Sequence, residues 1–447
     1  MDGATKITTR CCIAGGGPAG MMLAFLLARA GVEVVVLEKH ADFLRDFRGD
    51  TVHPSTLEVM HELGLLEEFL KLPHQEVRQL GGQIGEDFLQ LADFSHLPTK
   101  CKFIALVPQW DFLDFLADHA RQYPTFKLIM QAEVVDVITE GGRVAGVEAR
   151  APDEDLEVRA DLTIGADGRG SIVRDKAGLE TQKFGAPMDV LWFRLSRKDS
   201  DGEQTLGRIV DGKMMVMLNR GDYWQCGYLI RKGEFEKIKA RGLEQFCNDV
   251  VSVAPFVADR TNELANWDPI KLLTVRIDRL MKWYRPGLLC IGDAAHAMSP
   301  IGGVGINLAI QDAVAAANIL AERLSRNTVS LADLERVQLR RDFPTRMTQS
   351  LQIILQNNVI HRVLGNPDFR LPSVMKLFNR WPFLRRIPAR IVGIGFRAEH
   401  VRTPDMTQPV GRNPGDIMMR GMLRYTPESR LIRRKFLNWL FREDAKK

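Results

Sequence analysis

The stretch CCIAGGGPAGMMLAF, residues 11–25, decides the fold, because it places three glycines in the spacing G-x-G-x-x-G. Residues 7–14 are suited to a buried first strand. The run PAGMMLAFLLARAG, residues 18–31, has apolar side chains on most faces, which is typical of a helix packed against a sheet. VEVVVLE, residues 32–38, predicts a second strand. Together these elements predict a β-α-β dinucleotide cradle.

The cradle positions are Gly15, Gly17, Pro18, Ala19 and Gly20. The first glycine permits the tight turn, the second lets the backbone approach a pyrophosphate, and the third allows close packing of helix and strand. The helix start offers free N–H groups to the phosphates. Glu38 ends the second strand, just before Lys39, and its carboxylate suits a ribose 2′-OH but repels a 2′-phosphate. We therefore expect NAD or FAD in the cradle, and not NADP.

The bulk composition narrows the class of protein. With 447 residues, a net charge of +5 and 45% hydrophobic residues, the chain is long enough for two or three domains. Its six cysteines show no metal-ligand spacing, so we expect free thiols, a reducing compartment and no metal. The sequence shows no signal peptide and no apolar run of membrane-spanning length, which predicts a cytoplasmic protein. No nucleic-acid-binding motif accompanies the charge, so nucleic acid is not an expected partner.

Two segments far downstream distinguish FAD from NAD. In ADLTIGADGRGSIVRDKAGL, residues 160–179, a strand runs through Asp167 into a turn and a short helix. In RPGLLCIGDAAHAMSPIGGVGINLAIQDAVAAANIL, residues 285–320, a strand ends at Asp293 and a glycine-rich loop opens a long helix. Open α/β sheets bind ligands at such strand ends, and the free helix N–H groups can stabilise negative charge on a ring. Because FAD is the longer molecule and needs this second site, the sequence favours FAD.

The three segments together resemble the flavoprotein monooxygenases of the para-hydroxybenzoate hydroxylase type, the class A aromatic hydroxylases, over residues 7–350. The resemblance implies tightly but noncovalently bound FAD, with NADPH or NADH as a transient electron donor. It also implies that O2 and reduced flavin form a C4a hydroperoxide, which hydroxylates an aromatic or polycyclic small molecule. The alternative on the same scaffold is a flavin-dependent reductase or oxidase that inserts no oxygen. A non-catalytic flavoprotein ranks last, because Glu38, Arg48 and Asp293 are all present.

The resemblance also implies roles for individual residues. Asp167 would lie close to both FAD and the transiently bound nicotinamide nucleotide, and Asp293 would hold the ribityl chain. Arg48 would lie near the flavin edge, and Gln109 would hydrogen-bond the ribityl or ring region. A surface arginine and a helix-capping glutamine are the alternatives for these two. The loop and helix start beside the ring would supply the remaining cofactor positions, Pro300, Gly303, Gly305, Ile306 and Asn307.

The predicted fold class is α/β, with a Rossmann-like FAD-binding domain, an inserted antiparallel β-sheet substrate domain and a helical C-terminal region. Residues 234–255 predict one amphipathic helix beyond the inserted sheet. The predicted boundaries are 1–75, 99–180 and 270–350 for the FAD-binding domain, 76–98 and 181–269 for the substrate domain, and 351–447 for the basic C-terminal region.

The inserted sheet should give a dry, apolar roof over the flavin ring. Its large side chains are the substrate-pocket candidates, but by strand alternation only about half of them can face the pocket. They are Trp192, Phe193, Met215, Met217, Trp224 and Tyr228. No catalytic base stands out. His53 is a candidate proton relay, although a structural or surface role is commoner for such a histidine.

The C-terminal region mixes arginine with large apolar residues. RLIRRKFLNWLFRE, residues 430–443, can place its apolar side chains on one side of a helix, with its cations mostly elsewhere. That pattern is typical of an interfacial helix on anionic lipid, and it would suit a lipophilic substrate, as in the related ubiquinone hydroxylases. Packing on the FAD-binding domain or on a partner subunit is the alternative. Peripheral membrane contact and a monomer or homodimer therefore both stay open.

Overall fold

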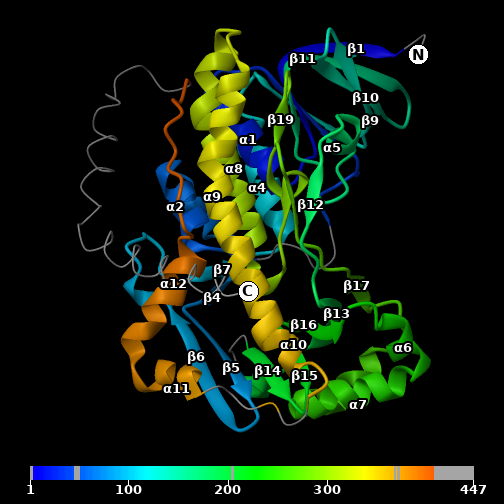
Figure 1. Cartoon of the computed structure of the whole chain (residues 1–447), viewed down its shortest axis with the longest axis vertical. Helices are drawn as coiled ribbons and strands as arrows, with labels where there is room; N and C mark the ends of the chain where they lie inside the picture. Colours follow the sequence, from blue (N-terminus) through cyan, green and yellow to red (C-terminus); the bar gives the residue numbers. More distant parts are fainter. Residues whose placement is uncertain (1–3, 45–50, 203–205, 367–368, 370–372, 407–447) are drawn as a thin grey trace, which may run out of the picture. The chain divides into compact units, whose positions relative to one another are not determined.

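The computed structural model describes residues 4–44, 51–202, 206–366, 369 and 373–406. The described residues up to Thr403 form a first compact unit, distinct from the residues that follow. Arg48 and the predicted interfacial helix at 430–443 lie outside the described residues. The first unit combines a mostly parallel sheet, a central group of long helices and a second sheet of mostly antiparallel strands (Figure 1).

The mostly parallel eight-stranded sheet carries the cradle, in the order β19-β20-β11-β1-β2-β8, with β10 and β9 added beside β11. Its parallel strands are β1 (Thr5–Ala14), β2 (Val34–Glu38), β8 (Phe126–Met130), β11 (Asp155–Gly165) and β20 (Leu288–Cys290). Its antiparallel strands are β9 (Glu133–Glu140), β10 (Arg143–Arg150) and β19 (Tyr284–Arg285). The register sets Ala14 beside Leu37 and Gly165, and Gly165 beside Cys290. The carboxyl ends of four parallel strands therefore lie in one row.

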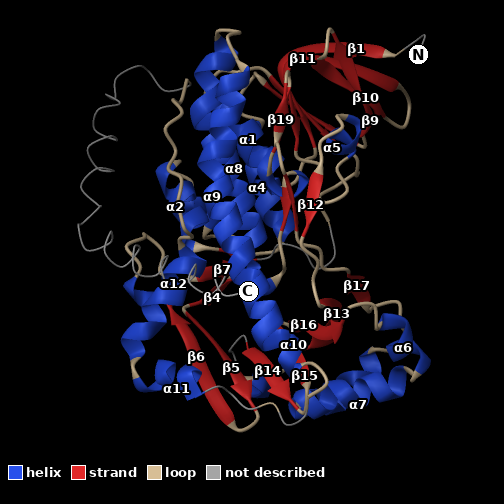
Figure 2. Ribbon diagram, in the orientation of Figure 1, coloured by secondary structure: helices blue, strands red, loops and turns tan. Residues whose placement is uncertain are grey.

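Long helices cover this sheet (Figure 2). Helix α1 (Pro18–Arg29) is buried from Ala19 to Ala28, which explains its lack of polar side chains, and it packs on α4 (Gln109–Ala120) and α8 (Val304–Ser325). By length and composition, residues 301–325 could cross a membrane, but 78% of the most apolar window is buried inside the protein. Helix α8 is therefore the central helix of the fold. Helix α9 (Leu331–Leu355) lies against it and continues through a π-helical turn, Gln356–Ile360, into α10 (His361–Val363).

The second sheet has seven strands in the order β17-β13-β16-β15-β14-β5-β6. They are β17 (Lys271–Leu273), β13 (Met188–Ser196), β16 (Tyr223–Arg231), β15 (Lys213–Asn219), β14 (Leu206–Val210), β5 (Gln79–Ile84) and β6 (Asp87–Asp93). All neighbours are antiparallel except β14 and β5, which pair in parallel with Gly207 beside Gly82. The domain boundaries stay a prediction, and β17 lies beyond the predicted end at residue 269.

The remaining elements are short. Two small sheets contain β3 (Thr51–Val52), β7 (Ile104–Leu106) and β4 (Gln75–Val77), and β12 (Thr181–Lys183), β18 (Asp278–Leu280) and β21 (His296–Ala297). The other helices are α2 (Pro54–Glu62), α3 (Leu66–Phe69), α5 (Ile172–Lys176), α6 (Phe235–Ala240), α7 (Leu243–Val253), α11 (Ser373–Arg380) and α12 (Arg386–Gly393). The single helix predicted at 234–255 is wrong, because Gly242 has φ +92° and separates α6 from α7. The predicted fold class is confirmed.

Candidate functional site

The three cradle glycines do different things in the structure. A Cβ on Gly15 would lie 2.4 Å from the Ala166 carbonyl oxygen, and one on Gly20 would lie 2.0 Å from the Gly15 oxygen. A Cβ on Gly17 would meet nothing within 4 Å, so the backbone there borders open space. Pro18 is the first residue of α1, whose first turn has no acidic residue and no side-chain cap. The turn therefore fits a pyrophosphate group, with open space and free N–H groups in one place.

Glu38 closes the cradle at the end of β2. It is buried, and its carboxylate accepts hydrogen bonds from the backbone N–H groups of Gly16 (2.8 Å) and His40 (3.1 Å). Those two bonds fix the direction of the carboxylate beside the glycine turn. Lys39 follows it with an exposed side chain. This geometry suits recognition of a ribose hydroxyl, the role expected from the sequence.

Asp167 lies two residues beyond β11 and organises the start of α5. Its carboxylate accepts hydrogen bonds from the Ser171 hydroxyl and from the Val173 N–H at 3.2 Å. Burial raises the pKa of Asp167 above its ordinary value, and these hydrogen bonds offset only part of that effect. Next along the turn, Arg169 donates from Nε to the Asp293 carboxylate at 3.1 Å. The structure therefore joins the two distant aspartate motifs through an arginine that the sequence analysis did not single out.

Asp293 stands just beyond β20 in the short turn Gly292–Ala294, and its position depends on a buried ion network. The fully buried Asp312 accepts a hydrogen bond from the Gly292 N–H at 3.1 Å, and the same oxygen lies 2.5 Å from His296 Nε2. Arg341 Nε donates to its other oxygen at 2.9 Å. Burial raises the pKa of Asp312, but His296 and Arg341 outweigh it, so this pKa lies below its ordinary value. Sequence reasoning missed Asp312, which lies within α8.

The loop before α8 contains the other predicted cofactor positions. Pro300 precedes a tight turn, Ile301–Gly303, and Gly303 caps α8 with φ +62°. A Cβ on Gly303 would lie 2.2 Å from the Thr51 hydroxyl oxygen, so only glycine fits there. Gly305 and Ile306 lie in the first turn of α8, which has neither a side-chain cap nor an acidic residue. The helix therefore presents free N–H groups at this end.

The side chain of Asn307 is occupied by the protein itself. Its oxygen accepts hydrogen bonds from the His53 N–H and the Thr56 hydroxyl, both at 2.8 Å, and its nitrogen donates to the Thr51 carbonyl at 2.9 Å. The amide thus holds the start of α2 against the start of α8. If Asn307 contacts a cofactor, the contact would come from its backbone and not from its side chain.

His53, the candidate proton relay of the sequence analysis, is held by the protein backbone. It is fully buried at the start of α2, and its Nδ1 donates to the Val392 carbonyl at 2.8 Å. Burial lowers the pKa of His53 to about 4, although the Val392 hydrogen bond opposes that shift. The ring is therefore neutral at pH 7. Gln109 is half-buried at the first position of α4.

The seven-stranded sheet settles which pocket candidates share a face. Phe193, Met215, Met217, Trp224 and Tyr228 are buried in one cluster with Phe246 and Val250 of α7. Strand alternation thus turns these five toward α6 and α7. Trp192 lies on the opposite face, across Gly227, with Met214, Val216 and Ile301 packed in the same cluster. That second face meets the loop that opens α8.

The chain was compared with known proteins. A family model described as "FAD binding domain" matches residues 8–349. A 6-methylpretetramide 4-monooxygenase of Streptomyces rimosus is 31% identical over 385 residues, covering 86% of this chain and 92% of the relative. A para-nitrophenol 4-monooxygenase of a Pseudomonas species is 25% identical, covering 67% of this chain and 75% of the relative.

Solved structures share the fold. An anhydrotetracycline hydroxylase from Streptomyces rimosus has a TM-score of 0.69 at 23% identity, covering 87% of this chain and 76% of that one. A p-nitrophenol 4-monooxygenase from Pseudomonas putida has a TM-score of 0.68 at 20% identity, covering 86% of this chain and 99% of that one. The glycine cradle, the row of strand ends and the family match agree with one another. The chain belongs to the FAD binding domain family and is an FAD-dependent oxidoreductase of the class A flavin monooxygenase type.

Proposed function

We propose that this protein uses FAD, NADPH or NADH, and O2 to hydroxylate an aromatic or polycyclic small molecule. The observation that carries the proposal is the row of four strand ends, which brings the glycine cradle, Glu38, Asp167 and Asp293 to one edge of the sheet. Relatives named for 6-methylpretetramide and para-nitrophenol support the aromatic substrate class.

The residues at this edge divide the cofactor between them. The turn at Gly15, Gly17 and Gly20 and the start of α1 would hold the pyrophosphate, and Glu38 would hold the adenosine ribose. Asp293, oriented by Arg169, would hold the ribityl chain. When bound, FAD supplies electron transfer from the nicotinamide donor and activation of O2.

The protein itself would position the reacting molecules, stabilise charge on the flavin ring and exclude water. Free N–H groups at the start of α8 would stabilise negative charge on the reduced ring. Trp192, Met214 and Val216 lie on the sheet face that meets Ile301, and they would keep water away from the reacting atoms. Trp192 thus stays a candidate substrate contact, and Met214 and Val216 take the place of the five side chains that pack on α7.

The test is rapid mixing of the chemically reduced, FAD-loaded protein with oxygen. p-Nitrophenol and anhydrotetracycline serve as probes, because relatives and neighbours are named for them or for similar compounds. We expect an absorbing species distinct from reduced and oxidised flavin, and isotopic oxygen from O2 in at least one product. Direct return to oxidised flavin with only peroxide formed, with and without every probe, would replace hydroxylation by the oxidase or reductase alternative.

A further inference from the structure

Helices α11 and α12 and the turn between them, Pro382–Arg385, carry an exposed group of large apolar side chains over β6 (Figure 1). Trp381 is 48% exposed, Phe383 59% and Ile387 49%. The rings of Trp381 and Phe383 stack, with centroids 6.2 Å apart and planes 20° apart. A contiguous patch of exposed apolar side chains often marks a site of interaction with another protein or a membrane. We call Trp381, Phe383 and Ile387 the apolar patch.

The apolar patch stands on a firmly packed base. Ala389 of α12 is fully buried in a cluster that includes Phe94 and Leu97, and a Cβ on Gly393 would lie 2.6 Å from a Leu97 methyl carbon. Arg385 ties the turn to the end of α11, because its guanidinium donates to the carbonyls of Phe378 at 2.8 Å and of Asn379 at 3.2 Å. The inner face of α12 is already packed against Phe94 and Leu97, so the patch cannot turn inward without unpacking α12.

The chain segment that carries the apolar patch is strongly basic. The sequence contains no aspartate or glutamate between Asp368 and Glu399. Arg380, Arg386 and Arg390 are exposed around the patch. Aromatic rings flanked by arginines match the boundary of an anionic bilayer, where rings enter the headgroup region and cations meet lipid phosphates. A second copy of the chain fits less well, because a two-fold interface would bring these three arginines close to their own copies.

The apolar patch also lies on a short line of contacts to the cofactor side. The Val392 carbonyl of α12 accepts a hydrogen bond from the His53 ring. The backbone N–H of His53 donates to the side-chain oxygen of Asn307. Asn307 also donates to the Gly303 carbonyl at 3.2 Å, in the loop that opens α8. The apolar patch is therefore linked through α12, His53 and Asn307 to the loop beside the proposed flavin position, a step that rests on the proposed function.

We propose that the apolar patch, with Arg380, Arg386 and Arg390, is a docking surface for a membrane that contains anionic lipid. The full-length, FAD-loaded protein is mixed with phosphatidylcholine vesicles with and without phosphatidylglycerol, and bound protein is measured by cosedimentation. The wild-type protein should prefer the anionic vesicles and be released by salt. The double variant Trp381→Ser with Phe383→Ser should bind about tenfold more weakly. Arg386→Gln with Arg390→Gln should weaken binding to anionic vesicles only.

The matched control is Leu339→Ser with Met281→Ser, because these side chains are 67% and 58% exposed on other elements. Flavin content and melting temperature should be unchanged in every variant, since all of these side chains are exposed. Vesicle binding that is equal in the wild-type and patch variants would overturn the proposal and assign the binding elsewhere in the chain. Absence of binding by the wild-type protein, or loss of self-association in the patch variant, would also overturn it. Because the oxygen reaction is measured without vesicles, either proposal can fail while the other stands.

Discussion

At the scale of single residues, Gly17 and Gly20 make a matched pair. Gly20→Ala would force a Cβ to within 2.0 Å of the Gly15 oxygen, whereas Gly17→Ala adds a methyl group to open space. We expect Gly20→Ala to lower the melting temperature of the FAD-free protein. Gly17→Ala should leave it unchanged but weaken FAD binding at least about tenfold, since the methyl group occupies the place of a phosphate. Calorimetry and flavin titration measure the two effects, and equal effects of both changes would refute the division of roles.

His53 makes acid stability depend on one buried ring. Its pKa falls from 6.5 in the unfolded chain to about 4 in the folded protein. Between these two pH values His53 is protonated in the unfolded chain but neutral in the folded protein. The free energy of unfolding therefore falls as the pH falls. The loss approaches about 3 kcal/mol by pH 4. We expect urea unfolding of His53→Gln, whose amide cannot titrate, to depend less on pH between 6.5 and 4 than unfolding of the wild type. Parallel pH profiles for the two proteins would contradict this assignment.

The spacing of residues predicted many of the cofactor-binding residues, but not the side chains that hold them in place. Gly15, Gly17 and Glu38 could be assigned because strand, turn and helix follow one another directly in the sequence. The pairing of Arg169 with Asp293 and of His296 with Asp312 depends on how distant segments meet, and local sequence carries no such information. The direction of Trp192 was undetermined for a related reason, since alternation divides a strand into two faces without saying which one is covered.

At the scale of elements, α9 holds the loop before α8 through side-chain amides. Gln349 and Gln352 of α9, three positions apart on one face, are buried, and so is Gln356 of the π-helical turn that follows. Gln352 accepts from the Ser299 N–H at 3.1 Å and donates to the Ser299 carbonyl at 2.9 Å, as a neighbouring strand would. It also donates to the Ile301 carbonyl at 3.0 Å. The amide thus fixes the backbone that leads into the loop beside the proposed flavin position.

Gln352→Met should therefore disturb the flavin as well as the fold. With the loop released, the α8 N–H groups would stabilise the reduced flavin less well, so we expect a more negative midpoint potential and weaker FAD binding. The control is Gln338→Met on the same helix, because Gln338 bonds the backbone of Met281 and Trp283 at 3.0 Å each, apart from the loop. Potentiometry should separate the two variants even where they lose similar stability. A potential that Gln352→Met leaves unchanged would remove its positioning role.

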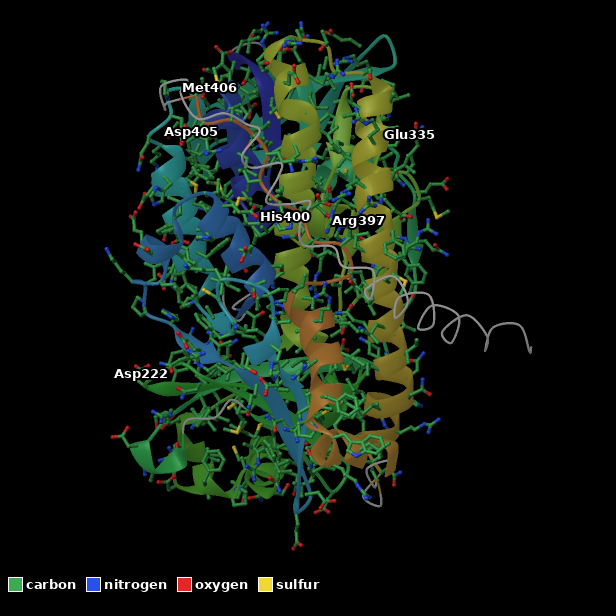
Figure 3. All side chains as sticks on the ribbon, turned by 90° about the vertical axis from the view of Figure 1, so that its left-hand side faces the viewer. Asp222, Glu335, Arg397, His400, Asp405 and Met406 are labelled. Atoms are coloured by element: carbon green, nitrogen blue, oxygen red, sulfur yellow. The ribbon has the colours of Figure 1, made fainter. Side chains whose placement is uncertain are left out.

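At the scale of the whole molecule, an extended segment at residues 397–403, the C-terminal strap, ties separate helices together. Figure 3 faces this segment and labels Arg397 and His400 on it. Its backbone accepts from Arg29 of α1, and donates to Glu62 of α2 at 2.8 Å and to Asn318 of α8 at 2.8 Å. Its buried Glu399 accepts from Arg340 and Arg341 of α9. The strap thus joins four helices from distant parts of the chain.

Removing the charge of Glu399 should destabilise the molecule as a whole. Glu399→Gln leaves the fully buried Arg341 with less compensating charge, and breaking such a buried pair costs about 3–5 kcal/mol. Urea unfolding should show a large drop in midpoint. Glu322→Gln removes the exposed ion pair with Arg326 and should change nothing measurable. Similar unfolding curves for the two variants would show that the strap contributes little to global stability.

The parallel pairing of β5 with β14 has a consequence for synthesis of the protein. The hairpin of β5 and β6 leaves the ribosome early, but its partner Gly207 follows Gly82 only much later in the chain. At a translation rate of roughly 5–20 residues per second, the edge of β5 waits roughly 6–25 seconds for that partner. During this interval the nascent chain displays an unpaired strand edge, which is a site for wrong pairing with other chains. Production of this protein should therefore depend on chaperones more strongly than its final stability suggests.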